Sequence, residues 1–124
     1  MSTVTRQALR GVGLGRIMVG LFNLVAAGRD DVPIFDSLPS RAIVAARVLA
    51  ARDLVQGAAL ALTPEDRVLQ VAHYGSAIDS LHAASMLPLV VFSGRYRGAA
   101  LLSAASAMAW IAVTSVAQRS SSRV

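Results

Sequence analysis

Three long apolar stretches of this chain each carry charged side chains near their centres. Arg16 lies in the first stretch, Arg52 and Asp53 lie in the second, and Asp79 lies in the third. A charge at the centre of a membrane helix costs about 2.5–3.5 kcal/mol on insertion scales, so such residues normally face the inside of a helix bundle and are paired. Two cations and two anions sum to zero. The pattern therefore predicts a buried ionic cluster of these four residues at the midplane of a bilayer.

The composition favours a membrane protein over a water-soluble one. Hydrophobic residues make up 55% of the 124 residues and charged residues 15%, with a mean hydropathy of +0.57. A typical soluble domain carries about 25% charged residues. The alternative is an alanine-rich soluble helix bundle. The apolar stretches disfavour it because they reach membrane-spanning length.

Four stretches are predicted to be transmembrane helices, at about residues 8–27, 42–62, 68–92 and 99–117. At a rise of about 1.5 Å per residue, each covers a hydrocarbon core of about 30 Å. The expected fold is all-α: a bundle of four transmembrane helices with the charge cluster buried at its midplane. Residues 1–124 are expected to form a single integral membrane domain.

All twelve basic residues are arginine, and the chain has neither lysine nor cysteine. These absences exclude Schiff-base chemistry on a lysine amine, disulfides, thiol catalysis and thiolate metal ligands. The net charge of +5 raises the question of nucleic-acid binding, but the arginines are scattered and form no basic stripe with interleaved aromatic residues. No nucleic-acid partner is expected. Contact with anionic lipid headgroups at the helix ends is the expected use of the surface arginines.

The first stretch is expected to be retained rather than cleaved as a signal peptide. Arg16 interrupts what would be the uncharged core of such a peptide, and the stretch exceeds the usual ~7–15 residues. The expected location is the plasma (inner) membrane, as a multi-pass protein. Basic residues divide almost equally between the two sides, and the acidic loop with Asp30, Asp31 and Asp36 favours cytoplasmic N- and C-termini.

The central charges of different helices can meet because the midpoints of spanning helices share one depth. Arg52 and Asp53 are neighbours that point about 100° apart on a helix, so each is expected to find its partner on another helix. The predicted pairs are Arg16 with Asp53 and Arg52 with Asp79, or the alternate pairing. The amides of Asn23 and Gln56 are expected to complete the hydrogen bonds. Such pairs either fix the register of the bundle or take part in function.

Asp79 and His82, spaced i,i+3, lie on adjacent parts of one helix face, with Ser76 one turn before Asp79. They are the candidate pair for proton relay or general acid–base chemistry, although no catalytic residue is assigned. The alternative is that His82 hydrogen-bonds a neighbouring helix. His73 lies nine residues before His82, on the opposite helix face, so one helix cannot bring both to a metal or a haem. No metal and no cofactor is expected.

The glycines of the first stretch are expected to serve helix packing. Gly11, Gly13 and Gly15 partly match a dinucleotide-binding loop, but Arg16 stands where a third motif glycine would be needed and no strand precedes them. Gly11 and Gly15 instead fit a Gly-x-x-x-Gly packing motif.

Three segments carry a resemblance to known proteins: residues 47–57, with Arg-Asp at their centre; residues 79–86, with Asp-x-x-His; and Arg95-Tyr96-Arg97. Over most of its length the chain resembles a group of small actinobacterial four-helix integral membrane proteins of unknown function. The resemblance implies the fold and no activity. Small multidrug transporters have a similar length and helix count, but their signature is a membrane-embedded Glu in the first helix, where this chain has Arg16.

Three functional hypotheses follow. The first is a small non-enzymatic membrane protein that self-associates or serves as an accessory subunit of a larger membrane assembly; its partners would be the lipid bilayer and a second copy or a larger membrane protein. It is favoured because the loops are too short to hold an extramembrane domain. The second is a proton-coupled small-molecule transporter with Asp79 and His82 as the titrating pair and Arg52 as counter-charge. The third is a membrane-embedded enzyme that acts on an apolar substrate through the same Asp and His.

Overall fold

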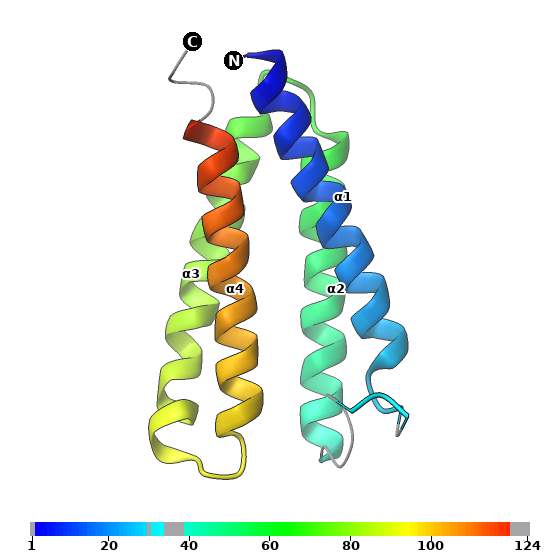
Figure 1. Ribbon diagram of the computed structural model, residues 1–124, viewed down its shortest axis with the longest axis vertical. Coiled ribbons are helices and arrows are strands. Elements are labelled where there is room, and N and C mark those ends of the chain that lie inside the picture. The colour runs from blue at the N-terminus through cyan, green and yellow to red at the C-terminus, as the bar shows by residue number, and fades with distance from the viewer. Residues whose placement is uncertain (1, 30, 34–38, 120–124) are drawn as a thin grey trace. The chain divides into compact units, whose positions relative to one another are not determined.

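The computed structural model describes residues 2–29, 31–33 and 39–119. They contain four α-helices, shown in Figure 1: α1 (Thr3–Ala26), α2 (Ser40–Leu62), α3 (Val68–Phe92) and α4 (Arg97–Arg119). The all-α prediction is confirmed. The described chain divides into two compact units, an α1–α2 unit of residues 10–62 and an α3–α4 unit that includes the chain up to Leu9 and from Thr63 onward.

Most helix boundaries lie close to the predicted ones. The range predicted for the third helix, 68–92, is the observed one, and α2 and α4 each begin two residues earlier than expected. The start of α1 was predicted five residues too late because its first turns are polar. The Ser2 Oγ accepts a hydrogen bond from the Thr5 backbone N–H (3.2 Å), which caps the helix at Ser2.

The α1–α2 unit is an antiparallel helix pair whose backbones touch at two places. A Cβ atom on Gly13 would lie 2.8 Å from the carbonyl oxygen of Gly57, and one on Gly20 would lie 2.9 Å from that of Ala50. The two contacts are seven residues apart on each helix, which is two turns. Any larger residue at either glycine would push the helices apart.

Arginines of each helix in this unit cap the carboxyl end of the other helix. Arg10 Nη1 donates to the carbonyl of Ala61 (3.1 Å), and Arg47 Nη2 donates to that of Ala27 (3.2 Å). The last carbonyls of a helix lack intrahelical partners and carry the negative end of its dipole, so a guanidinium is a well-matched donor there. After Ala27 the chain turns at Gly28, whose φ of +84° favours glycine.

The α3–α4 unit is a second antiparallel pair, with small residues on its inner faces. The buried residues of each helix recur every three, four or seven positions: Val68, Ala72 and Asp79 on α3, and Ala100, Ala107, Thr114 and Ala117 on α4. Small side chains allow two helices to approach closely without help from a hydrophobic effect.

The connections at the two ends of α3 are held by polar contacts. Before α3, Arg6 Nη1 forms an ion pair with Glu65 Oε1 at 2.7 Å. After α3, Arg97 Nε donates to the carbonyl of Val90 (2.8 Å), and the Tyr96 N–H donates to Ser93 Oγ (3.3 Å). The turn between α3 and α4 is therefore closed by its own side chains.

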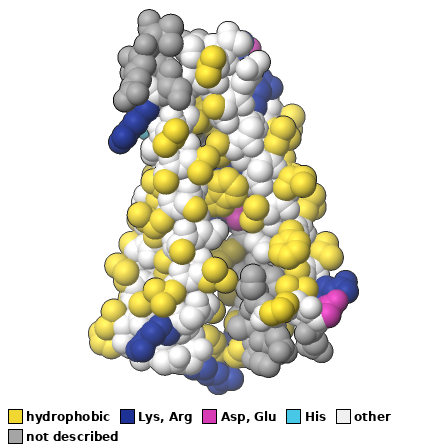
Figure 2. All heavy atoms as spheres, in the orientation of Figure 1, with side chains coloured by type: hydrophobic (Ala, Val, Ile, Leu, Met, Phe, Trp, Pro, Cys, Tyr) yellow, Lys and Arg dark blue, Asp and Glu magenta, His cyan; other side chains and the backbone are white. Residues whose placement is uncertain are grey.

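Large apolar side chains cover the outside of the helices. Examples on α1, α2 and α3 are Met18, Val55 and Phe92, the last 85% exposed. Figure 2 shows hydrophobic side chains along much of the visible face. α1, α3 and α4 are long and apolar enough to cross a membrane. α2 carries four charged residues and is not among these helices, so the predicted membrane spans are confirmed in this sense for three helices.

Candidate functional site

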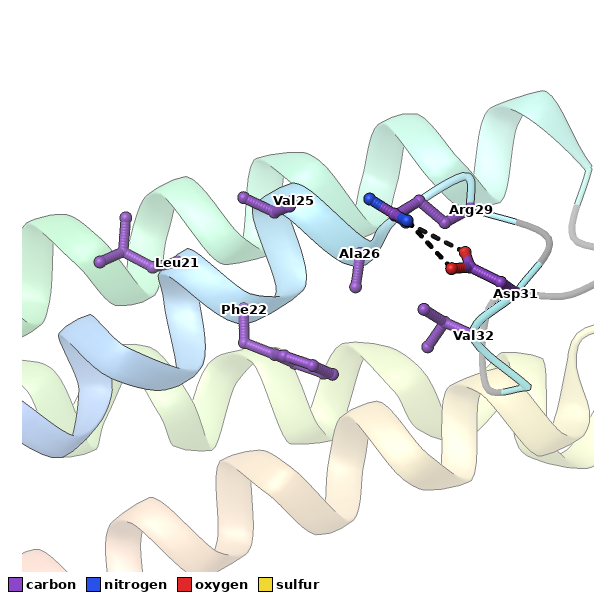
Figure 3. A pocket seen from close by; sticks show the side chains of 7 residues that line it. All are labelled: Leu21, Phe22, Val25, Ala26, Arg29, Asp31 and Val32. Atoms are coloured by element: carbon purple, nitrogen blue, oxygen red, sulfur yellow. Dashed lines mark hydrogen bonds and ion pairs between the residues drawn. The ribbon is translucent and has the colours of Figure 1, made fainter.

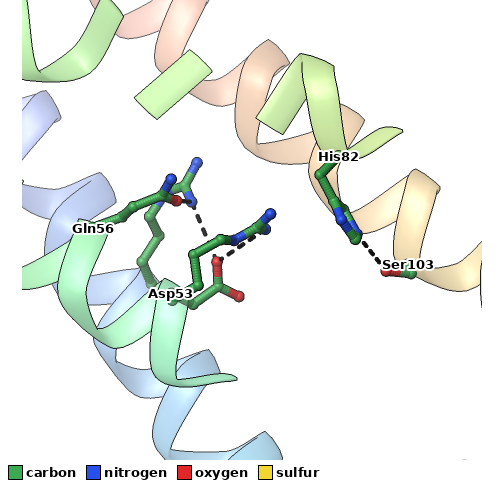
Figure 4. A network of polar contacts seen from close by, with 6 residues as sticks. Asp53, Gln56, His82 and Ser103 are labelled. Atoms are coloured by element: carbon green, nitrogen blue, oxygen red, sulfur yellow. Dashed lines mark hydrogen bonds and ion pairs between the residues drawn. The ribbon is translucent and has the colours of Figure 1, made fainter. Parts of the chain in front are cut away.

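A polar layer lies inside the α1–α2 unit, between its two backbone contacts. Arg16 is 1% exposed, and its Nη1 donates to Asp53 Oδ1 at 3.3 Å and to Gln56 Oε1 at 2.5 Å (Figure 4). Asp53 is also buried. The structure thus brings together Arg16 with Asp53, one of the two pairs expected from the sequence. A guanidinium removed from water needs such partners because an unpaired buried charge is strongly destabilising.

The structure contradicts the expectation that Arg52 and Asp53 do not pair with each other. Its Nη2 lies 3.7 Å from Asp53 Oδ1, within ion-pair distance. The backbone directions do diverge by about 100°, but the arginine side chain is long enough to curl back along the helix. The Asp53 carboxylate therefore lies between two guanidinium groups. The expected pairing of Arg52 with Asp79 would join the two units and stays a prediction.

The two amides expected to support the cluster behave differently. The Gln56 oxygen accepts from Arg16 of the other helix and so completes the hydrogen bonds of the cluster as expected. The Asn23 side chain makes no hydrogen bond within the described part of the chain; its backbone carbonyl accepts from the Ala27 N–H. Asn23 is two helical turns, about 10 Å, beyond Arg16. The guanidinium extends across to α2 instead of along its own helix.

The α3–α4 unit holds the other candidate residues. Asp79 is fully buried (0% exposed) and is not without an interaction partner. The His82 Nε2 lies 2.7 Å from Ser103 Oγ on α4, as Figure 4 shows. A hydrogen bond from His82 to a neighbouring helix was the alternative to a proton relay, and it is present. Ser76 is half-buried, and its carbonyl accepts from Ser80 Oγ (2.8 Å). Proton exchange between Asp79 and His82 stays a prediction.

The remaining polar candidates form no metal site in the described chain. His73 is exposed on α3, and its Nδ1 lies 2.7 Å from the Leu69 carbonyl of its own helix. Among residues 2–29, 31–33 and 39–119, no three His, Asp or Glu side chains come together as metal ligands would.

The packing motif predicted at Gly11 and Gly15 does not contact α2 through Gly11. A Cβ on Gly11 would meet no described atom within 4 Å, whereas Gly13 and Gly20 face α2 directly. The glycines at 11, 13 and 15 point in different directions around the axis of α1. Only the rotation of α1 about its axis, which turns Arg16 toward Asp53, decides which of them contacts α2.

A shallow apolar depression of about 450 Å³ lies at the carboxyl end of α1. The side chains that line it, drawn in Figure 3, include Leu21, Phe22 and Val25 of α1 and Arg29 and Asp31 beyond the end of that helix. Those two side chains bind each other through two hydrogen bonds of 2.9 and 3.0 Å. None of the candidate residues named from the sequence lines this depression.

The sequence reasoning missed the capping arginines at positions 10, 47 and 97 and the Arg6–Glu65 pair. Each capping arginine contacts a backbone carbonyl. Every residue has a backbone carbonyl, so no oppositely charged residue in the sequence indicates these contacts. Ser103 is one of several hydroxyl residues of α4, and only its position opposite His82 in the helix pair distinguishes it.

Comparisons with protein-family models, with curated proteins and with solved structures find no match to this chain. Only the packing, burial and charge of its own residues therefore bear on its function. The resemblance to small actinobacterial membrane proteins stays a prediction.

Proposed function

We propose that this chain is a small four-span membrane protein that acts without catalysing a reaction, as a self-associating unit or as an accessory subunit of a larger membrane assembly. One observation carries the proposal: the helices expose their large apolar side chains and bury three of the four central charges, Arg16, Asp53 and Asp79. A water-soluble domain rarely exposes contiguous apolar patches of more than a few hundred Å². Lipid is the solvent that suits such a surface.

The proposal includes α2 as the fourth span, although α2 is less apolar than the other helices. Its central Asp53 is paired with Arg16, and Arg47 reaches the end of α1. A charge that is already paired inside a helix hairpin does not face lipid, so the insertion scale for single helices overstates its cost. The exposed face of α2 carries apolar residues such as Val44, Val48 and Val55.

Membrane topology tests whether α2 spans. Since the chain has no cysteine, single cysteines introduced at Asp31, Asp66 and Gly94 can be labelled without background. All three positions are exposed, and a Cβ on Gly94 meets no described atom within 4 Å. If α2 spans, a membrane-impermeant maleimide labels positions 31 and 94 from one side and position 66 from the other.

The same labelling has a distinct outcome if α2 lies outside the membrane. Positions 31 and 66 would then share one side, and position 94 would lie on the opposite side. This outcome would overturn the four-span proposal. The result does not depend on which terminus is cytoplasmic, because the experiment asks only which of the three positions are labelled from the same side of the membrane.

The accessory role is supported by how little of the described chain lies outside the helices. The turn between α2 and α3 covers residues 63–67, and the turn between α3 and α4 covers residues 93–96. Purification from native membranes in a mild detergent, followed by mass measurement of the intact particle, tests this role. A homo-oligomer or a stoichiometric complex with larger subunits is expected, and a lone monomer with proton or substrate flux would contradict it.

The second candidate function, proton-coupled transport, is favoured by the burial of Asp79 one turn from His82. A carboxyl and an imidazole inside a membrane protein are typical of proton pathways. In proteoliposomes that contain a pH-sensitive dye, a transporter would dissipate a proton gradient, and Asp79→Asn or His82→Gln would stop it. His73→Gln is the matched control, because His73 is exposed and, among the residues that the structure describes, its ring bonds only to its own helix.

A further inference from the structure

The turn between α3 and α4 differs in charge from the other two connections of the chain. Together with the first residue of α4 it contributes Arg95 and Arg97, and no Asp or Glu occurs anywhere after Asp79. The connection after α1 contains Asp30, Asp31 and Asp36 beside Arg29, and the one after α2 contains Glu65 and Asp66 beside Arg67. Only the α3–α4 turn has positive charge without a carboxylate to balance it.

Both guanidinium groups of this turn are held in place. Arg97 Nε donates to the Val90 carbonyl at 2.8 Å, which leaves its two Nη groups without a protein acceptor in the described chain. The Arg95 guanidinium lies over the Tyr96 ring, 5.7 Å from its centroid. Both arginines are exposed. Because these contacts order the two side chains in advance, an anion that binds them meets a smaller entropic cost.

The positive charge of this turn is also unbalanced because it lies at the amino end of α4. Arg97 is the first residue of α4, and α4 has no acidic residue in its first turn. A helix amino terminus carries the positive end of the dipole, so cations there are unfavourable and an anion is favourable. Arg97 stabilises the end of α3 but not the start of α4.

Exposed apolar side chains flank the turn on both helices. Val91 and Phe92 end α3, and Leu101 and Leu102 lie in the second turn of α4; all four are more than half exposed. A tyrosine beside arginines at the end of an apolar helix is typical of the headgroup level of a membrane. The turn thus combines fixed cations with an apolar surface directly below them.

We infer that the α3–α4 turn binds the phosphate of an anionic phospholipid through Arg95 and Arg97, with the acyl chains against Phe92 and Leu101. The inference rests on the proposed membrane insertion. Guanidinium groups match phosphate oxygens in geometry as well as in charge. The apolar flanks select a lipid over a soluble phosphate, because a soluble anion would gain nothing from them.

Lipid retention tests this inference. The full chain is purified in mixed micelles of phosphatidylglycerol and phosphatidylcholine, and the ratio of co-purified lipids is measured by mass spectrometry. The wild type should be enriched in phosphatidylglycerol. Each arginine near an anionic surface contributes about fivefold in binding, so Arg95→Gln with Arg97→Gln should remove most of the enrichment.

A matched variant separates this turn from net charge. Arg29→Gln with Arg67→Gln removes the same two charges from connections that contain carboxylates, and it should change the enrichment less than twofold. Arg95→Gln alone keeps the Arg97 cap on α3 and should still lower the enrichment several-fold. Equal loss in the two double variants, or no loss in Arg95→Gln, would overturn the inference.

Vesicle insertion and carbonate extraction distinguish failure of the lipid-site inference from failure of the proposed membrane insertion. A chain that inserts into phosphatidylcholine vesicles and resists carbonate extraction, but shows no preference for phosphatidylglycerol, contradicts only the lipid site. A chain that carbonate extracts from both kinds of vesicle contradicts membrane insertion itself.

Discussion

Arg16 occupies a layer that direct backbone contacts close off on both sides. Gly13 with Gly57 lies on one side of this layer, and Gly20 with Ala50 lies on the other. The guanidinium has little freedom to turn elsewhere when Asp53 changes, and the carboxylate has little freedom when Arg16 changes. The contribution of this pair is therefore best measured by removing the partners singly and together.

Arg16→Leu is expected to lower the free energy of unfolding by about 3–5 kcal/mol, because it leaves a buried carboxylate without its main partner. Arg16→Leu combined with Asp53→Asn should lose less. Unfolding in mixed micelles with increasing SDS, followed by circular dichroism, measures both. Equal losses in the two variants would mean that these residues do not act as a pair.

The exposed pair of Arg29 and Asp31 offers a pH measurement outside the helices. Two hydrogen bonds from Arg29 lower the pKa of the Asp31 carboxyl below its ordinary value of 3.8. Stabilisation from this pair is therefore present above that value and is lost as the pH falls through the lowered pKa; it is small because the pair is solvated. NMR titration should show the pKa of Asp31 rising in Arg29→Gln, and an unchanged pKa would contradict the pairing.

At the scale of the helices, close contact at glycine holds α1 against α2. Gly57→Ala would place a Cβ 2.6 Å from the Gly13 carbonyl oxygen and should destabilise the protein by about 1–3 kcal/mol. Gly11→Ala is the control. It meets no described atom within 4 Å and should be neutral or stabilising, by up to about 1 kcal/mol. SDS-titration midpoints compare the two, and the opposite ranking would refute the observed helix contact.

The helices themselves could be predicted because their apolar runs are long and their boundaries are marked by Pro, Gly and charged residues. The contact between Arg16 and Asp53 could be predicted from charge and depth. The choice of Gly13 over Gly11 follows from that contact, because Gly13 lies three residues before Arg16 on the same helix face, whereas Gly11 lies on another face. The support expected from Gln56 is present, since its oxygen accepts from Arg16; which arginine it serves is decided by the facing helix and not by spacing along one helix.

At the scale of the whole molecule, the pairing of Arg52 with Asp79 predicted from the sequence can be tested by exchanging the charges. Arg52→Asp or Asp79→Arg alone should destabilise the chain, since each places like charges in a buried setting. The double exchange should recover much of the loss. Its recovery is read from the SDS-titration midpoint, and a double variant no better than the worse single one would refute the pairing.

The order of synthesis gives the α1–α2 layer a consequence for biogenesis. Arg16 leaves the ribosome 37 residues before Asp53, so the first helix reaches the translocon with a bare guanidinium at its centre. Its counter-ion arrives only with the middle of the next helix. A released chain that ends before residue 53 is therefore expected to slip back from the bilayer, whereas one that includes α2 stays.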